Sequence, residues 1–349
     1  MRWRFGFWAG DWYEKAGWGS AMNRRKFLIA GVGATALGAD ILSERLLHGA
    51  MRPEGEIASK LAAMPGALAP MALGLIVRPG ENPEEEIAKV RALGLTNCFL
   101  SLDDYIGKFT AEAAARFRAA LEKYQLTPTC AEVVGPGRLV WDFLDGPATI
   151  GIVPRESRAA RVDALKQTSD FAKRLGIPRV QTHCGFIPEN PRDALYAEAV
   201  EAIREVAQHC GGNGQEFLME TGQETPTTMA RAIRDVNMPN LGVGLDVANL
   251  ILYGKANPVD AVDIIGPHVK SIHAKDGMWP TDPMKLGEEV LIGTGKVDFL
   301  KVFTKLHELG YTNPVTIERE ISGARQIEDV KKEKEYLEMT LARVRTAAA

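Results

Sequence analysis

Residues 216–246, EFLMETGQETPTTMARAIRDVNMPNLGVGLD, hold a short apolar run, a helical segment and a second short apolar run. Apolar runs of this length are typical of buried strands, and Thr225-Pro226 before the middle segment is a favourable helix start. The same order repeats from about Met71 to the C-terminal region. It predicts eight strands, at residues 71–77, 97–101, 127–133, 179–184, 216–220, 241–246, 269–273 and 315–318.

Helical segments lie between and after these strands. One begins at Asn82-Pro83, and the others cover residues 110–124, 155–175, 194–210, 225–236, 258–265, 297–309 and 326–344. Eight strand–helix units over about 275 residues match the length and order of a single (β/α)8 TIM barrel, an α/β fold. A doubly wound open sheet is the alternative, and the lack of a GxGxxG motif after the first strand argues against it. We therefore predict a barrel domain at residues 70–347, with residues 51–69 as a linker or helical lead-in.

The first 50 residues differ from the rest of the chain in charge, with seven Lys/Arg against four Asp/Glu. Arg24 and Arg25 precede the apolar, Gly/Ala-rich run Ile29–Ala39, which is too short to span a membrane. A twin arginine before such a run is typical of a Tat export signal. We expect residues 1–50 to be an extension with the signal at about residues 22–39, recognised by the Tat machinery. The expected location is the periplasm or another exported one, and a cytoplasmic location is the alternative.

Replacing Arg24 and Arg25 together with lysine tests the export signal. We expect the double variant to accumulate in the cytoplasm, because the Tat pathway recognises the arginine pair. Cell fractionation followed by immunoblotting measures the distribution, with a periplasmic marker protein as control. Export at the level of the natural sequence would contradict the Tat assignment.

The amino-acid composition and net charge exclude some classes of function. The chain is 46% hydrophobic and 25% charged, which is ordinary for a globular protein, and its net charge is −3. No basic surface for nucleic acid is indicated, so we expect a small-molecule partner and no nucleic acid. The four cysteines lie far apart without a CxxC pair, which favours free, buried thiols over disulfides or a thiolate zinc site. Assembly into a homo-oligomer stays open.

Ionisable residues end four consecutive predicted strands: Glu220, Asp246, His273 and Glu318. Period-2 alternation places them on the face opposite their apolar neighbours, and in a TIM barrel the C-terminal strand ends carry the chemistry. Three converging carboxylates repel one another unless a cation neutralises them. Two Glu, one Asp and one His suit Mn²⁺, Mg²⁺ or Co²⁺ and, less distinctively, Zn²⁺. We predict one divalent metal ion at this position.

Four stretches of the barrel region carry a family resemblance: residues 217–225, 244–250, 271–276 and 310–320. With them, residues 70–345 resemble the xylose isomerase-like sugar phosphate isomerase/epimerase superfamily. The resemblance implies a sugar isomerase or epimerase that binds one divalent metal ion, often Mn²⁺, through Glu220, Asp246, His273 and Glu318.

Two positions depart from the ketose 3-epimerases of that family. Asn249 stands where they carry a His, and Trp279 stands where they carry an Arg. Both family residues bind substrate oxygens, so the resemblance points away from free ketoses. The runs at residues 220–225 and 273–276 are more similar to members that act on inososes or on 3-keto sugars and glycosides. Asn249 and Trp279 are predicted substrate contacts.

Other polar residues are predicted near the same strand ends. Gln181 and His183 end the fourth strand and point inward, Gln181 toward substrate and His183 as a general base or hydroxyl ligand, with a structural histidine as the alternative. Lys275 shares the face of His273 and binds a substrate oxygen or forms a salt bridge. Glu320 shares the face of Glu318 nearer the rim.

Residues 132–154 are harder to interpret from sequence. Glu132 ends the third strand and supports the metal ligands or serves a structural role. The loop after it, residues 134–154, contains Trp141 and Phe143. A long loop at this end of a barrel is either a lid that stacks on a sugar or packing against the next helix.

The predicted chemistry is proton transfer at the carbon next to a carbonyl, through an enediolate. Glu220 or Glu318 removes the proton, and the other glutamate or His183 returns it. Return to the opposite face gives epimerisation, return to the neighbouring carbon gives isomerisation, and loss of a β-oxygen makes the protein a lyase or, in reverse, a hydratase. A non-catalytic sugar-binding protein is a further alternative. DNA endonucleases that share the barrel need a histidine-rich three-metal site, which six histidines and the acidic charge disfavour.

Overall fold

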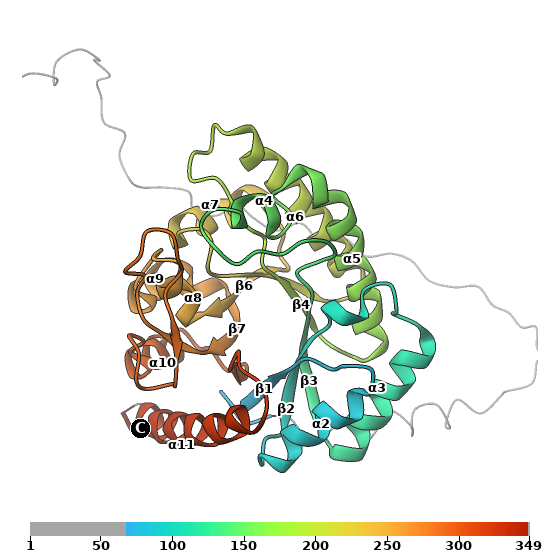
Figure 1. Cartoon of the computed structure of the whole chain (residues 1–349), viewed down its shortest axis with the longest axis vertical. Helices are drawn as coiled ribbons and strands as arrows, with labels where there is room; N and C mark the ends of the chain where they lie inside the picture. The colour runs from blue at the N-terminus through green and yellow to red at the C-terminus, as the bar shows by residue number, and fades with distance from the viewer. Residues whose placement is uncertain (1–67, 348–349) are drawn as a thin grey trace, which may run out of the picture. The chain divides into compact units, whose positions relative to one another are not determined.

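The computed structural model describes residues 68–347. In this part of the chain, eight parallel strands close into a barrel in the order β1-β10-β7-β6-β5-β4-β3-β2, and helices surround them (Figure 1). The closed order confirms the predicted TIM barrel and excludes the open sheet. The barrel strands are β1 Leu73–Val77, β2 Asn97–Ser101, β3 Thr127–Glu132, β4 Arg179–Thr182, β5 Glu216–Glu220, β6 Leu241–Asp246, β7 Val269–Ala274 and β10 Val315–Ile317.

Every predicted helix is present within a few residues of its expected bounds. The long helices are α2 Pro83–Ala92, α3 Ala111–Tyr124, α5 Arg155–Arg174, α6 Ala194–Gly212, α7 Pro226–Val236, α9 Pro258–Ile265, α10 Phe299–Glu308 and α11 Ala324–Ala347. Pro83 begins α2 as predicted, but the side chain of Asn82 makes no capping hydrogen bond there. Thr225 does cap α7, because its side chain accepts a hydrogen bond from the Thr228 N–H. The sequence did not predict two short helices, α4 Gly146–Thr149 and α8 Val247–Leu252, or the antiparallel pair β8 Asp276–Gly277 and β9 Glu289–Val290.

Side chains alternate between two layers along each barrel strand. The outward layer packs beneath the helices and includes the fully buried Met219, Leu245, Ile272 and Ile317. The interior holds a separate apolar cluster, formed by Phe99, Cys130, Leu218 and the partly buried Ile76. Two apolar layers separated by the strands are what period-2 alternation produces in a barrel.

The interior apolar cluster is the floor of a cavity. A cavity of about 460 Å³ lies at the C-terminal strand ends. A polar side chain lines it two residues after each residue of the apolar cluster, on the same strand face. These four side chains are Arg78, Ser101, Glu132 and Glu220. The ring of Phe99 lies edge-on to that of His273, with centroids 4.6 Å apart. The two-residue period of the strands therefore places the apolar cluster at the floor of the cavity and the polar side chains on its wall.

Two loops cross tightly beside this cavity. The N–H groups of Ile152 and Val153 both donate to the Cys184 carbonyl, at 2.9 and 3.2 Å. A Cβ on Gly151 would lie 2.1 Å from the Cys184 carbonyl carbon, and a Cβ on Gly185 would lie 2.3 Å from the Ile150 oxygen. Both glycines also have positive φ, so the crossing depends on the absence of side chains.

The predicted export signal and most of the 51–69 segment lie outside the described residues, so both stay predictions. No helix between residues 68 and 347 is long and apolar enough to cross a membrane. All four cysteines are free and buried, as the sequence predicts.

Candidate metal centre

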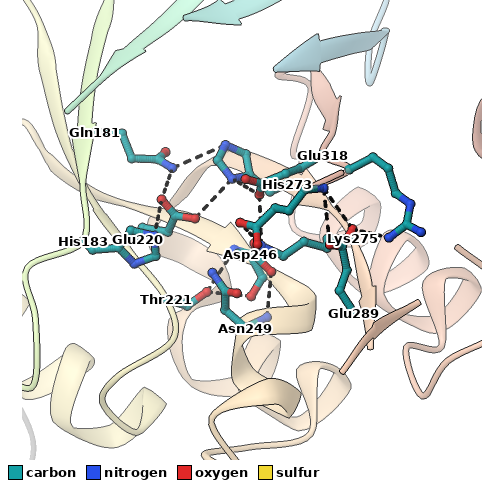
Figure 2. A network of polar contacts seen from close by, with 12 residues as sticks. Gln181, His183, Glu220, Thr221, Asp246, Asn249, His273, Lys275, Glu289 and Glu318 are labelled. Atoms are coloured by element: carbon teal, nitrogen blue, oxygen red, sulfur yellow. Dashed lines mark hydrogen bonds and ion pairs between the residues drawn. The ribbon is translucent and has the colours of Figure 1, made fainter. Parts of the chain in front are cut away.

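The four predicted metal ligands meet at the C-terminal end of the barrel. Glu220 ends β5, Asp246 ends β6, His273 lies near the end of β7 and Glu318 follows β10, and all four are buried. Each offers one ligand atom within 4.8 Å of the others. Nδ1 of His273 lies 3.2 Å from Glu220 Oε1 and 3.1 Å from Glu318 Oε2, and Figure 2 shows these side chains converging.

Two of the ligand atoms make no hydrogen bond among the described residues. They are Asp246 Oδ2 and His273 Nδ1, both fully buried. The other ring nitrogen of His273 lies 3.4 Å from Gln181 Nε2, which leaves Nδ1 directed at the carboxylates. Buried polar atoms without hydrogen bonds cost free energy, and a divalent cation among these atoms would remove that cost. The donor set therefore fits an ion that prefers oxygen ligands and accepts one imidazole.

The charges of the centre depend on one another. Burial raises the pKa of Asp246 to about 7, although Lys275 lowers it. Burial also opposes ionisation of Glu220, but His183 and His273 outweigh it and hold the Glu220 pKa well below its usual value. Burial lowers the His273 pKa, but Glu220 and Glu318 raise it well above the usual value. Because metal binding at Nδ1 competes with that proton, metal affinity will fall as the pH falls.

Lys275 is the buried cation of the centre. Its Nζ lies 3.0 Å from Asp246 Oδ2, as an ion pair without hydrogen-bond geometry, and 3.3 Å from Glu318 Oε2. It also donates to Glu320 Oε1 at the rim, at 3.2 Å. These carboxylates raise the pKa of Lys275 well above its usual value, against the effect of burial. The salt-bridge alternative for Lys275 is thus present, and its contact with substrate stays a prediction.

Comparison with known proteins identifies the family. A family model described as the xylose isomerase-like TIM barrel matches residues 87–340. The chain belongs to this family. The crystal structure of a xylose isomerase domain protein from Planctomyces limnophilus is 31% identical, with a TM-score of 0.73, and the match covers 80% of this chain and 99% of that one.

Other known proteins match the chain at lower sequence identity. An uncharacterized protein of Methanocaldococcus jannaschii is 26% identical over 191 residues, which are 52% of this chain and 62% of that protein. The chain thus spans less than two thirds of that relative's length. A D-tagatose 3-epimerase-like protein shares the fold at 19% identity and a TM-score of 0.64, over 80% of this chain and 100% of that one. A D-psicose 3-epimerase and the 3-keto-D-glucoside 4-epimerase of E. coli share the fold at 17% and 14% identity, each with a TM-score of 0.55, and this likeness shows the fold alone.

The residues predicted from strand four lie beside the predicted metal ligands. Gln181 Nε2 donates to Glu220 Oε2 at 3.0 Å. His183 Nε2 lies 3.3 Å from the same oxygen, and its Nδ1 lies 3.3 Å from Gln223 Oε1. Trp141, from the loop after β3, packs edge-on against His183 with ring centroids 4.9 Å apart. His183 therefore lies between the predicted metal ligands and the loop that is predicted to be either a lid or packing against the next helix.

The predicted substrate contacts separate into three groups. Asn249 lines the cavity, while Gln181 and Lys275 are buried beneath it. Trp279 is not among the residues that line the cavity and is 37% exposed. The chain turns away after Asp276 to form the β8–β9 pair, and this turn carries Trp279 with it. The structure therefore gives no support to Trp279 as a substrate contact.

The sequence did not predict several cavity residues, among them Arg78, Asp103 and Tyr253. Arg78 follows β1, and its Nη2 lies 3.8 Å from both Glu318 Oε1 and Glu320 Oε1. Because it stands two residues beyond the interior Ile76, the rule that found Glu220 would have found it. Asp103 accepts hydrogen bonds from the Val134 and Gly135 N–H groups and fixes the start of the loop after β3.

Proposed function

We propose that the protein is a divalent-metal-dependent sugar isomerase or epimerase that acts on a keto-sugar through an enediolate. The observation that carries the proposal is the convergence of Glu220 and Glu318 on His273 Nδ1, at 3.2 and 3.1 Å. A divalent ion held by Glu220, Asp246, His273 and Glu318 would polarise a substrate carbonyl and stabilise negative charge on its oxygen. By the chemistry of the donor set we favour Mn²⁺.

The side chains of the centre supply the proton transfers. Glu220 is ionised near neutral pH and lies on the cavity wall, so it can remove the proton next to the carbonyl. Glu318 also lines the cavity and can return the proton to the other face or to the neighbouring carbon. His183, 3.3 Å from Glu220, is the alternative proton donor.

The cavity suits a substrate in ring form. Its volume of about 460 Å³ lies in the range of small-molecule sites, about 300–1,000 Å³. Trp141 and Tyr253 offer aromatic surfaces for the apolar faces of a sugar ring, and the carboxylates accept hydrogen bonds from its hydroxyls. Asn249 adds an amide that does not titrate near neutral pH. We therefore propose a 3-keto-glycoside or an inosose as substrate.

Elimination is a second candidate reaction, supported by Glu132. Burial and the neighbouring Glu220 raise the pKa of the Glu132 carboxyl well above its usual value, which favours its protonated form. It also lines the cavity. A protonated carboxyl beside the base can give its proton to a leaving oxygen, which is the requirement of a lyase.

Hydrogen exchange with solvent tests the proposed function. Purified protein with Mn²⁺ in D₂O is expected to place deuterium on the carbon next to the carbonyl of a 3-keto-glycoside or inosose, and chelation should stop the exchange. Free psicose, fructose and tagatose are the matched comparison, with exchange expected to be at least about 100-fold slower. NMR of the recovered sugars measures the incorporation and separates epimer, isomer and elimination product. Exchange confined to the free ketoses would overturn the substrate class, and no exchange with any of these sugars would overturn the proposed function.

A further inference from the structure

A second group of ligand atoms adjoins the first and shares Glu220 with it. Glu132 at the end of β3, His183 after β4 and Glu220 at the end of β5 each offer an atom within 4.8 Å of the others. All three are buried, and all three line the cavity, whereas Asp246 and His273 of the first group do not. The second group is thus the one that faces a bound substrate more directly.

Glu132 has an unsatisfied ligand atom. Its side chain is more than nine-tenths buried, and its Oε1 has no hydrogen-bond partner in residues 68–347. No lysine or arginine forms an ion pair with it within 4.0 Å in this region. A buried carboxylate oxygen without a donor is costly unless it binds a proton or a cation.

His183 is oriented as a metal ligand. Its Nδ1 lies 3.3 Å from Oε1 of the Gln223 side chain, which suits a proton on Nδ1. With the proton there, the Nε2 lone pair faces Glu220 Oε2 across 3.3 Å. Two lone pairs that face each other repel unless a proton or a cation lies between them. A hydrogen bond from the other ring nitrogen is also how ligating histidines are usually held in position.

The charge of the two groups leaves room for a second cation. Four buried carboxylates, Glu132, Glu220, Asp246 and Glu318, face one buried lysine, Lys275. Lys275 contacts Asp246 and Glu318, and Arg78 also approaches Glu318, at 3.8 Å. Glu132 and Glu220, the carboxylates of the second group, have no lysine or arginine within 4.0 Å among the described residues.

We propose that a second divalent cation binds beside the first, held by Glu132, His183 and Glu220, with Glu220 bridging the two ions. Three protein ligands leave further coordination positions, which open onto the cavity and can take a water molecule or a substrate oxygen. Two carboxylates and one imidazole suit Mn²⁺, Co²⁺ or Zn²⁺. The inference uses the same cavity as the proposed function but does not depend on its chemistry. With the second ion bound, Glu318 and not His183 or Glu132 is the proton donor.

Counting bound metal tests the proposal. The full-length protein, stripped of metal, is titrated with Mn²⁺ alone, and free Mn²⁺ is measured by its EPR signal. We expect two ions per chain for the natural sequence and one for Glu132→Gln, and also one for His183→Gln, which removes the nitrogen ligand. At saturation the natural sequence should show the broadened spectrum of two coupled Mn²⁺ ions, and both variants the six-line spectrum of an isolated ion.

Glu224→Gln is the matched control. Glu224 is also a buried glutamate whose carboxylate oxygens have no hydrogen-bond partner in the described region, and burial raises its pKa to about 8. It belongs to neither ligand group, so this variant is expected to bind two ions. Thermal melts establish that each variant is folded, and either Glu132→Gln or His183→Gln suffices for the comparison.

One ion per chain in the natural sequence would overturn the second site, as would two ions in Glu132→Gln. Failure of the proposed function has a different result: two bound ions without deuterium exchange into any sugar would leave the second site standing. Deuterium exchange by a protein that binds only one ion would support the proposed function and overturn the second site.

Discussion

Replacing Glu220 with glutamine is expected to lower kcat by about 10³-fold, within the range for loss of a general base, while the barrel stays folded. Glutamine keeps the shape of the side chain but removes the charge that balances His183 and His273. Gln181, which donates to Glu220 Oε2, can still donate to the amide oxygen. We also expect weaker metal binding, because Glu220 belongs to both ligand groups. Steady-state kinetics, metal titration and circular dichroism measure the three effects.

Glu216→Gln is the control for that substitution. Glu216 begins the same strand, β5, at the end opposite to the cavity, and forms an ion pair with Arg179 at 2.8 Å. This exchange removes the same charge from the same strand, so kcat is expected to stay within a factor of two or so of the natural sequence. Near-normal turnover by Glu220→Gln with metal bound would move the catalytic site elsewhere.

Replacing Arg319 with methionine is expected to lower the free energy of unfolding by about 3–5 kcal/mol, the usual effect of removing one partner from a buried ion pair. The Arg319 side chain is buried and lies 2.8 Å from Glu289, 3.0 Å from Asp329 and 3.8 Å from Glu333. Methionine fills part of the volume but leaves these carboxylates without their cation. Urea unfolding followed by circular dichroism measures the change.

Arg325→Met separates burial from charge in this test. Arg325 also approaches Asp329, at 3.9 Å, but its side chain is 79% exposed. An exposed ion pair contributes little, so the expected change is below about 0.5 kcal/mol. Equal effects of the two variants would contradict the argument. Since Arg319 directly follows Glu318 and binds Glu289 of β9, its loss should also disturb the metal centre.

The barrel and the first ligand group could be predicted because both depend on a period of two. The strands keep their outward side apolar, as at Met219 and Ile272, and direct polar residues inward at their C-terminal ends. That pattern is local and can be found in the sequence. Arg78 obeys it too and was missed only because the first predicted strand was not followed past Val77.

Other parts of the site could not be found in this way. The position of Trp279 depends on the β8–β9 pairing, which joins residues 276–277 to residues 289–290 across an irregular segment without strand periodicity. The contact between His183 and Gln223 joins two loops that are 40 residues apart. Such contacts depend on the three-dimensional course of the loops, and no repeating pattern of hydrophobic residues encodes that course.

The crossing at Gly151 and Gly185 limits how this protein can be re-engineered for other sugars. The loop that carries Trp141 and the segment that carries His183 are joined where they leave the barrel, so neither can be transplanted without the other. Between Val134 and Ile150, by contrast, the chain leaves and returns to fixed points, so changes within this span leave the crossing itself intact. A library that randomises residues 138–148 would therefore vary the part of the cavity that Trp141 borders. Because it keeps Gly151 and Gly185, it would preserve the loop crossing that holds the segment with His183.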